Sequence, residues 1–274
     1  MRVVSPLVDA LRQIDDWPCE NVVAGVLGNV KATYGPPDRV FAWASVTKLA
    51  TAVAMLVAVE EGIVDLDEPA GGPEGSTLRH LLAHASGLPF DSGSPIAKPG
   101  QRRIYSNYGF DIARDFVERR ADMEFESYFH DVWRETGMVL RGSAGSGVSG
   151  TLHDLMQLAG ELLEPRRLLR ETLDEATTVQ FPGLDGVLPG FGRQSPNDWG
   201  LGFELRDAKS PHWTGSRNSP RTFGHFGRSG TFLWVDPEAR IALGVLTDRA
   251  FGDWAKDAWP RLSDAVLHEV SDTF

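Results

Sequence analysis

Apolar positions are densest between Leu49 and Val59, a stretch that reads as a buried helix and stops at Glu60. The segment before it, 40–44, has the pattern of a short strand or an extended entry to that helix. Ser45 therefore stands where the extended chain turns into the helix. Backbone N–H groups at the start of a helix have no partner within it, so the N–H of Ser45 could stabilise an oxyanion.

The rest of the pattern predicts helices through the middle of the chain and strands mainly near its ends. Residues 5–16 have the pattern of an amphipathic helix, not of a secretion signal, because charged residues interrupt it. Strands are expected near 22–30, 200–205, 231–235 and 241–247. Further helices are expected near 76–85, 107–120, 124–134, 151–163, 170–178 and 254–270.

This order of elements predicts a mixed α/β (α+β) fold in which both ends of the chain contribute to one sheet. The N- and C-terminal helices flank that sheet, and a mostly helical region is inserted between the two ends. We therefore expect a discontinuous sheet domain, residues 1–59 and 199–274, and an inserted helical domain, residues 60–198. Two Gly/Pro-rich connectors, 88–100 and 181–196, are too long for simple turns and are candidate walls of a site.

Composition narrows the possible partners of the chain. Its 274 residues carry a formal net charge of −11, which disfavours nucleic acid and anionic membranes as partners. Cys19 is the only cysteine, so an intramolecular disulfide and a thiolate metal cluster are excluded, and a free thiol suits a reducing cytosol. No apolar stretch has the length needed to span a bilayer. We expect a cytoplasmic protein, unless an export signal was removed, and its oligomeric state stays open.

Lys48 lies three residues after Ser45 and could serve as its proton acceptor. Positions i and i+3 lie on one face of a helix, about 5–6 Å apart at Cβ, so the amine can reach the hydroxyl. A neutral amine there could take the hydroxyl proton and make Ser45 a nucleophile. The alternative is a serine that only caps the helix. Of the five lysines, only Lys48 has a serine three positions earlier.

Tyr105-Ser106-Asn107 precedes another predicted helix and offers a second set of polar groups. A phenolate held by cationic neighbours can act as a general base. The Asn107 amide can hydrogen-bond both the lysine and a substrate carbonyl. The alternative is a core tyrosine followed by a helix-capping asparagine.

A third candidate segment, 224–230, combines glycines with His225 directly before the strand expected at 231–235. Glycines at a strand edge let a ligand lie close to the backbone, and a histidine can supply a polar or cationic group. The alternative is a β-turn with a surface histidine.

Three other patterns carry less weight. His80 and His84 have the i, i+4 spacing of zinc ligands, but no glutamate base lies between them, so a metal site is not expected. Residues 145–150 match Gly-x-Gly-x-x-Gly without a surrounding strand-helix-strand unit, and we interpret them as a flexible loop at the cleft, with Ser149 or Thr151 capping the next helix. No Gly-x-Ser-x-Gly elbow is present, which argues against an α/β-hydrolase.

In this order the motifs resemble those of serine β-lactamases and penicillin-binding D-peptidases, in the class C-like and esterase branch. The resemblance covers nearly the whole chain and implies an antiparallel sheet flanked by terminal helices, with an inserted helical region. The segments that carry it are 41–48, 62–69, 78–88, 105–107 and the His225-x-Gly227 segment.

The resemblance implies Ser45 as the acyl-accepting nucleophile, Lys48 as its proton partner, and Tyr105 as the base that activates the serine or the deacylating water. The oxyanion hole would be the backbone N–H groups of Ser45 and Arg228, the latter on the strand that follows His225. This scheme requires a buried Lys48, because a charged amine is no base at neutral pH. No cofactor or metal is implied. The implied substrate-binding residues are Asn107, His225, Gly227 and Arg228.

Two departures from the family pattern bear on the substrate. His225 stands where many relatives carry lysine, so the charge that anchors a substrate carboxylate depends on pH. Phe226 replaces a threonine or serine and removes a hydroxyl donor, although Arg228 could restore a cationic contact. We therefore expect a serine hydrolase that acts on a small, neutral carboxylic ester or amide. The alternatives are a β-lactamase or D-amino-acid peptidase, and a penicillin-binding sensor that turns over poorly.

Overall fold

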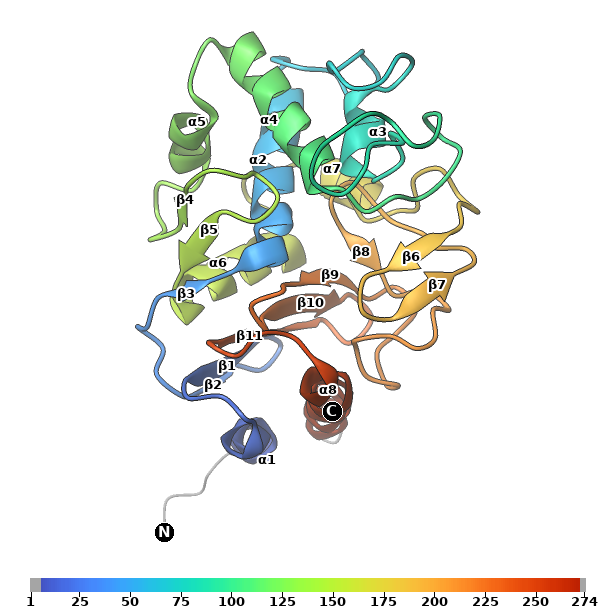
Figure 1. The fold of residues 1–274 in the computed structure, drawn as a ribbon. Helices are drawn as coiled ribbons and strands as arrows, with labels where there is room; N and C mark the ends of the chain where they lie inside the picture. Colours follow the sequence, from blue (N-terminus) through green and yellow to red (C-terminus); the bar gives the residue numbers. More distant parts are fainter. Residues whose placement is uncertain (1–5, 272–274) are drawn as a thin grey trace.

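The computed structural model describes residues 6–271, and its centre is a six-stranded antiparallel sheet (Figure 1). Its strands are β1 (Val22–Gly28), β2 (Ala32–Tyr34), β8 (Glu204–Leu205), β9 (Phe223–Phe226), β10 (Phe232–Asp236) and β11 (Ile241–Thr247). The strand order is β2-β1-β11-β10-β9-β8. β1 pairs with β11 over its whole length, from Val22 opposite Thr247 to Gly28 opposite Ile241. Both ends of the chain thus share the sheet, as the sequence predicts.

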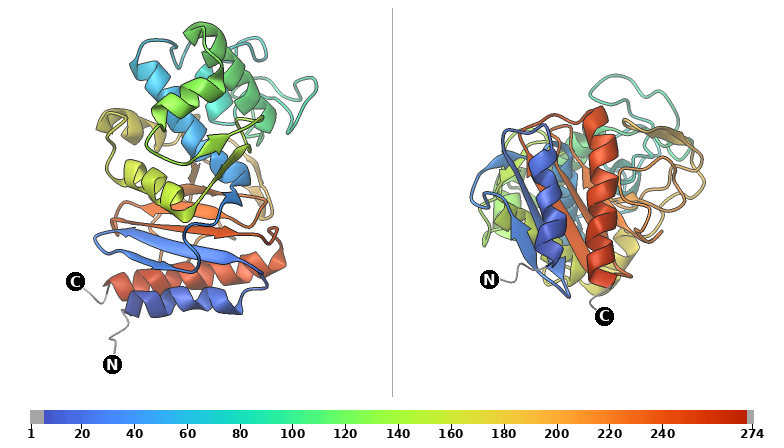
Figure 2. Two further views of the ribbon diagram at one scale, coloured as in Figure 1. Left: turned by 90° about the vertical axis from the view of Figure 1, so that its left-hand side faces the viewer. Right: turned by 90° about the horizontal axis from the view of Figure 1, so that it is seen from below.

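Helices cover both faces of this sheet. α1 (Pro6–Leu11) and α8 (Asp253–Ser271) lie side by side on one face (Figure 2). α6 (Leu152–Leu163) packs against β1, β10 and β11 on the other face. Each face buries its own apolar core, one under α1 and α8 and the other towards the helical half of the molecule.

α2 (Thr47–Glu60) runs from the sheet into the helical half, between α4 and α5 (Figure 1). Nearly every residue of its first three turns is buried, as expected for a helix that is apolar on all sides. The remaining helices are α3 (Leu78–Leu82), α4 (Asn107–Ala121), α5 (Phe125–Val132) and α7 (Arg170–Ala176). The 3₁₀ turns are η1 (Arg12–Asp16) and η2 (Ala44–Val46).

Two small sheets complete the fold. β3 (Phe41–Ala42) pairs with β5 (Val148–Gly150), which pairs with β4 (Val139–Leu140). β6 (Gly186–Leu188) and β7 (Gly192–Gln194) form a hairpin in the connector that the sequence marks as a site wall. The end of the predicted flexible loop at 145–150 is therefore a strand, and Thr151 caps α6 together with Asp154.

The predicted fold class and most predicted helices are confirmed, with corrections at the strands. β9 has no counterpart among the predicted strands, because all four of its residues are buried and no alternation marks them. The strand expected over 200–205 is only two residues long, because the chain turns at Gly202, which has a φ of +85°.

The described residues, 6–271, include no helix that is long and apolar enough to cross a membrane. The first residue of the predicted N-terminal helix, Ser5, lies outside the described residues. The division into a sheet domain and an inserted domain stays a prediction. Within the predicted insertion, α6 packs against the sheet.

Candidate active site

Ser45 is the middle residue of η2, between β3 and α2. The hydrogen bonds of this turn are donated by the N–H groups of Val46 and Thr47, so the N–H of Ser45 is not used by the turn. Ala44 has a φ of 46°, a left-handed conformation that is costly for a residue with a side chain. The chain therefore accepts backbone strain to bend sharply just before Ser45.

Gly227 lets the end of β9 approach this bend. A Cβ atom at position 227 would lie 2.4 Å from the carbonyl oxygen of Trp43, so any larger residue would force the two segments apart. Thr231 Oγ1 donates to the same carbonyl at 2.9 Å. The next amide, that of Arg228, has no acceptor in the described part of the chain. Two unused N–H groups, of Ser45 and Arg228, thus border the contact and are candidates for an oxyanion hole.

Lys48 is fully buried on α2, and its Nζ has three oxygen neighbours. Nζ lies 2.6 Å from Asn107 Oδ1, 2.8 Å from the Gly145 carbonyl oxygen and 3.3 Å from Ser45 Oγ. Burial lowers the pKa of Lys48 to about 7. A neutral amine has two N–H donors, and the two carbonyl oxygens accept both. In that form its lone pair is available to the Ser45 hydroxyl, 3.3 Å away, as a general base requires.

Tyr105 lies on the other side of Ser45, just before α4. Its Oη donates a hydrogen bond of 2.7 Å to Ser45 Oγ. Desolvation raises the pKa of Tyr105, and the hydrogen bond with Ser45 only partly opposes this effect. In the resting site Tyr105 is therefore a neutral phenol and a proton donor, not a phenolate base.

His225, on β9, completes the polar chain behind Tyr105. Its Nδ1 lies 2.6 Å from the carbonyl oxygen of Phe226, which can only accept, so Nδ1 carries the ring proton. Nε2 is then an acceptor 3.3 Å from Tyr105 Oη, and it competes with Ser45 Oγ for the single phenolic proton. Burial, assisted by the charge of Lys48, lowers the pKa of His225 to about 3. At neutral pH His225 thus has no charge to anchor a substrate carboxylate, and its role in substrate binding stays a prediction.

Asn107 and the residues around it fix the start of α4. Ser106, not Asn107, caps this helix, because its Oγ accepts from the N–H of Gly109 at 2.9 Å. The N–H of Asn107 donates to the Phe90 carbonyl at 2.8 Å. The Asn107 side chain is thereby left to hold Lys48.

The structure shows where the side chains of Phe226 and Arg228 lie, and it corrects the position expected for Arg228. The ring of Phe226 packs with Trp213, Phe251 and Trp259 in the core under α8, so its replacement of a polar residue does not put an apolar ring beside Ser45. Arg228 is not on a strand. It is in the turn between β9 and β10, with its side chain exposed.

Comparison with known proteins places the chain in a family. The profile of the Beta-lactamase family matches residues 22–139 and 129–267. The chain belongs to the Beta-lactamase family. A beta-lactamase from Mycobacterium bovis is 54% identical, with 95% of this chain and 99% of that chain covered and a TM-score of 0.93. No curated protein matches the chain.

More distant solved structures share the Beta-lactamase family fold. Simvastatin synthase from Aspergillus terreus is 19% identical, with a TM-score of 0.78 and coverage of 98% of this chain and 96% of that chain. EstCE1, a hydrolase with promiscuous acyltransferase activity, is 17% identical, with a TM-score of 0.75 and coverage of 96% and 98%.

One contact of this Beta-lactamase family site has no clear signal in the sequence. The Gly145 carbonyl accepts from Lys48, although the glycine-rich segment around it reads as a loop beside the cleft. A backbone carbonyl leaves no side-chain signature. A Cβ at position 145 would lie 3.0 Å from Asn107 Oδ1, so the small residue there reflects the close contact.

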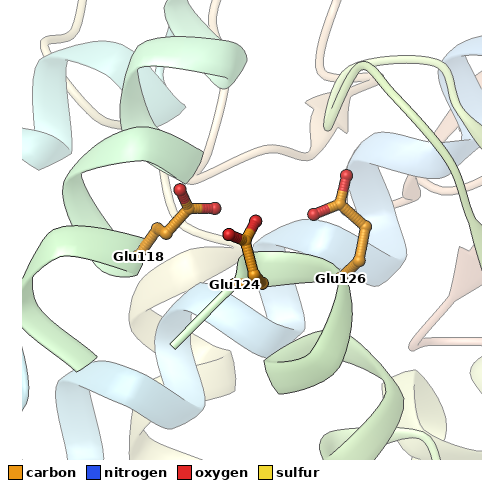
Figure 3. Close-up of side chains that lie close together, drawn as sticks. All are labelled: Glu118, Glu124 and Glu126. Carbon is orange, nitrogen blue, oxygen red and sulfur yellow. The ribbon is translucent and has the colours of Figure 1, made fainter. Parts of the chain in front are cut away.

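An acidic cluster lies away from this site, where α4 is followed by α5 (Figure 3). Carboxylate oxygens of Glu118, Glu124 and Glu126 lie within 4.8 Å of one another, and Glu118 accepts a 3.0 Å hydrogen bond from the N–H of Phe125. Glu118 thereby caps the start of α5. Exposed carboxylates gather in this way without an ion, so this cluster receives no ligand assignment, and the expectation of a metal-free protein stays a prediction.

Proposed function

We propose that this Beta-lactamase family member is a serine hydrolase that cleaves a small, neutral carboxylic ester through an acyl-enzyme at Ser45. The observation that carries the proposal is the pair of contacts to Ser45 Oγ, from Tyr105 at 2.7 Å and from Lys48 at 3.3 Å. A serine that only caps a helix needs neither contact. A buried lysine whose pKa is lowered to about 7 is also the group that a general base requires.

In the proposed acylation, Ser45 Oγ attacks the ester carbonyl carbon while its proton passes to the lone pair of Lys48. The carbonyl oxygen becomes an oxyanion and accepts hydrogen bonds from the N–H groups of Ser45 and Arg228. As the C–O bond to the alcohol breaks, Tyr105 donates its phenolic proton to the leaving oxygen. The acyl-enzyme then contains a Tyr105 phenolate and a protonated Lys48, whose charges stabilise each other.

Deacylation uses the same groups in reverse order. The Tyr105 phenolate takes a proton from a water molecule, whose oxygen attacks the acyl carbon. When the tetrahedral intermediate collapses, Ser45 Oγ leaves and recovers its proton from Lys48. The carboxylic acid departs and both side chains return to their neutral forms. One water molecule is consumed for each ester cleaved.

The absence of a charge on His225 supports a neutral substrate. His225 is 3% exposed, with a pKa lowered to about 3, so it is neutral across the physiological range. Asn107 donates and accepts without adding charge. We expect this enzyme to act in the cytoplasm on a small molecule, without a cofactor.

A second candidate function is the hydrolysis of a β-lactam or a D-amino-acid peptide. The 54% identical relative from Mycobacterium bovis is called a beta-lactamase, which favours this candidate. The exposed cation of Arg228 could meet the substrate carboxylate in place of His225. A penicillin-binding sensor that acylates and then turns over poorly has the same site.

Intact-mass spectrometry separates these functions. The protein and its Ser45→Ala variant are incubated with a fluorophosphonate, a penicillin and a p-nitrophenyl ester, and adduct mass and released product are followed together. We expect a Ser45-dependent fluorophosphonate adduct and steady turnover of the ester.

Each of the other possible results of this experiment supports a different candidate function or none. Turnover of penicillin faster than of the ester would favour the β-lactamase, and a lasting penicillin adduct without turnover would favour the sensor. The absence of a Ser45-dependent adduct with all three probes would end every proposal of acyl transfer at this site.

A further inference from the structure

We propose that His84 is a positioning residue for Tyr105 and Asn107, acting through the backbone of the segment that carries them. The inference rests on the proposed function, since it assigns His84 to the acylation reaction at Ser45. His84 touches neither Ser45 nor Lys48 through a hydrogen bond, so it takes no part in proton transfer.

His84 holds the chain on both sides of Tyr105. Its carbonyl oxygen accepts from the N–H of Ile104 at 2.9 Å, and its Nδ1 accepts from the N–H of Ser106 at 3.2 Å. The residue before Tyr105 and the residue after it are thus bound to the same histidine. These bonds fix the direction in which the phenol leaves the backbone.

The imidazole ring also forms part of the wall against which the phenol packs. Its centroid lies 4.7 Å from that of Tyr105, 4.7 Å from that of Trp199 and 5.5 Å from that of Phe110. His84 is 1% exposed, so solvent does not compete for its bonds.

Position 84 carries two costs that a purely space-filling residue would avoid. Its φ of 54° is left-handed, and its Nε2 is buried with no hydrogen-bond partner among the described residues. Because Nδ1 accepts from Ser106, the ring proton must lie on Nε2, where nothing receives it. An apolar side chain would remove that unsatisfied N–H. The hydrogen bond that Nδ1 accepts from Ser106 offsets the cost of the unpaired Nε2–H.

The bond to Ser106 requires a neutral ring, since an imidazolium has no acceptor. Burial keeps the pKa of His84 well below its usual value, and the positive charges of Arg103 and of protonated Lys48 act in the same direction. The surroundings thus preserve the form that can accept.

The test compares three variants in fluorophosphonate labelling and p-nitrophenyl ester hydrolysis. His84→Leu fills the site but has no acceptor. His84→Asn keeps an acceptor, Oδ1, near the position of Nδ1 and tolerates the left-handed backbone. His80→Asn is the matched control, because the His80 side chain, on α3, packs on Phe181 and forms hydrogen bonds in the described part of the chain with Thr77 alone.

We expect His84→Leu to lower kcat and the labelling rate at least about 10-fold with little change in KM, as misalignment of a transition-state group does. His84→Asn should recover most of that loss, and His80→Asn should behave as the parent protein does. Equal losses in the Leu and Asn variants, or full activity in the Leu variant, would overturn the assignment. A parent protein that is not labelled at Ser45 would instead refute the proposed function.

A measurement on the parent protein keeps the inference testable if His84→Leu does not fold. In a protein with ¹⁵N-labelled histidine, the nitrogen shifts of His84 should show a neutral ring that is protonated at Nε2 and hydrogen-bonded at Nδ1. A proton on Nδ1 at neutral pH would contradict the assignment, since that nitrogen could not accept from Ser106.

Discussion

Among single residues, Lys48 connects catalysis with stability. It lies in the first turn of α2, a helix that is buried on nearly every side, and among the described residues its Nζ forms hydrogen bonds with oxygens of Ser45, Asn107 and Gly145. Burial disfavours the charged amine. This effect suits Lys48 to the proposed role of a base at neutral pH, and it also penalises the folded state while the amine stays protonated.

The first prediction concerns the pH dependence of acylation. If neutral Lys48 is the base, the rate should rise as pH increases and level off above its pKa of about 7. The fluorophosphonate labelling rate of the free enzyme, followed by intact mass, reports this pKa directly. His225 and Tyr105 titrate outside the neutral range, so neither should add a second limb there. A rate that is flat between about pH 6 and about pH 8 would rule out Lys48 as the base.

The second prediction is the corresponding effect on stability. Between its folded pKa of about 7 and the ordinary lysine pKa of 10.5, Lys48 binds a proton in the unfolded chain but not in the folded one. Raising pH in this window therefore stabilises the folded state, by up to about 1.4 kcal/mol per pH unit. The variant Lys48→Met lacks this contribution. The difference in unfolding free energy, parent minus variant, should increase by about 2 kcal/mol between about pH 7.5 and about pH 9 in urea titrations. Parallel pH curves for the two proteins would contradict a buried, neutral Lys48.

At the scale of elements, the site depends on how closely β9 approaches η2. The Trp43 carbonyl oxygen lies 2.4 Å from where a Cβ of residue 227 would be, and Thr231 Oγ1, just before β10, donates to it. The candidate oxyanion hole takes the N–H of Ser45 from η2 and the N–H of Arg228 from the turn after β9, so it spans this contact. Its spacing should therefore control the acylation rate.

The third prediction tests that spacing with Gly227→Ala. The added methyl carbon would lie 2.4 Å from the Trp43 oxygen, so β9 and η2 must separate. Losing one oxyanion donor costs about 10²- to 10³-fold in kcat, and we expect a loss of that size with a lower Tm. Gly160→Ala is the control, because its Cβ would meet only Leu27 Cδ2 at 3.5 Å in the interior of α6. That variant should keep full activity and gain about 0.5–1 kcal/mol. An active Gly227→Ala would show that the approach is not needed.

The elements also show how far sequence reasoning reaches. α2 was predictable because its apolar run is long, and β11 because seven apolar-rich residues are bounded by turn signals. β9 was not predictable, because its four residues are all buried and show no alternation of apolar and polar positions. Its place in the sheet is decided by its pairing with β10. Ser45, Lys48 and Tyr105 could be proposed from motif spacing. The Gly145 carbonyl and the neutral state of His225 could not, since both depend on burial by distant segments.

For the whole molecule, the net negative charge of the chain and the uncharged His225 both bear on the proposed preference for a neutral substrate. The chain carries a formal net charge of −11, which repels an approaching anion at low ionic strength. Nearer the nucleophile, His225 adds no compensating charge at neutral pH. An anionic ester is therefore opposed during its approach and gains no attraction from His225 once bound, whereas a neutral ester meets neither effect.

The last prediction follows from this combination. With p-nitrophenyl acetate, kcat/KM should stay constant as salt increases from about 0.02 M to about 0.5 M, because a neutral substrate does not interact with the net charge. With the succinate half-ester, which keeps a free carboxylate, kcat/KM should start lower and rise several-fold as the repulsion is screened. The two esters share a leaving group, so the ratio of their rates isolates the charge. A half-ester that reacts faster at low salt would point to a cation at the site entrance. Arg228→Gln would then identify it, since the Arg228 side chain is exposed in the turn after β9.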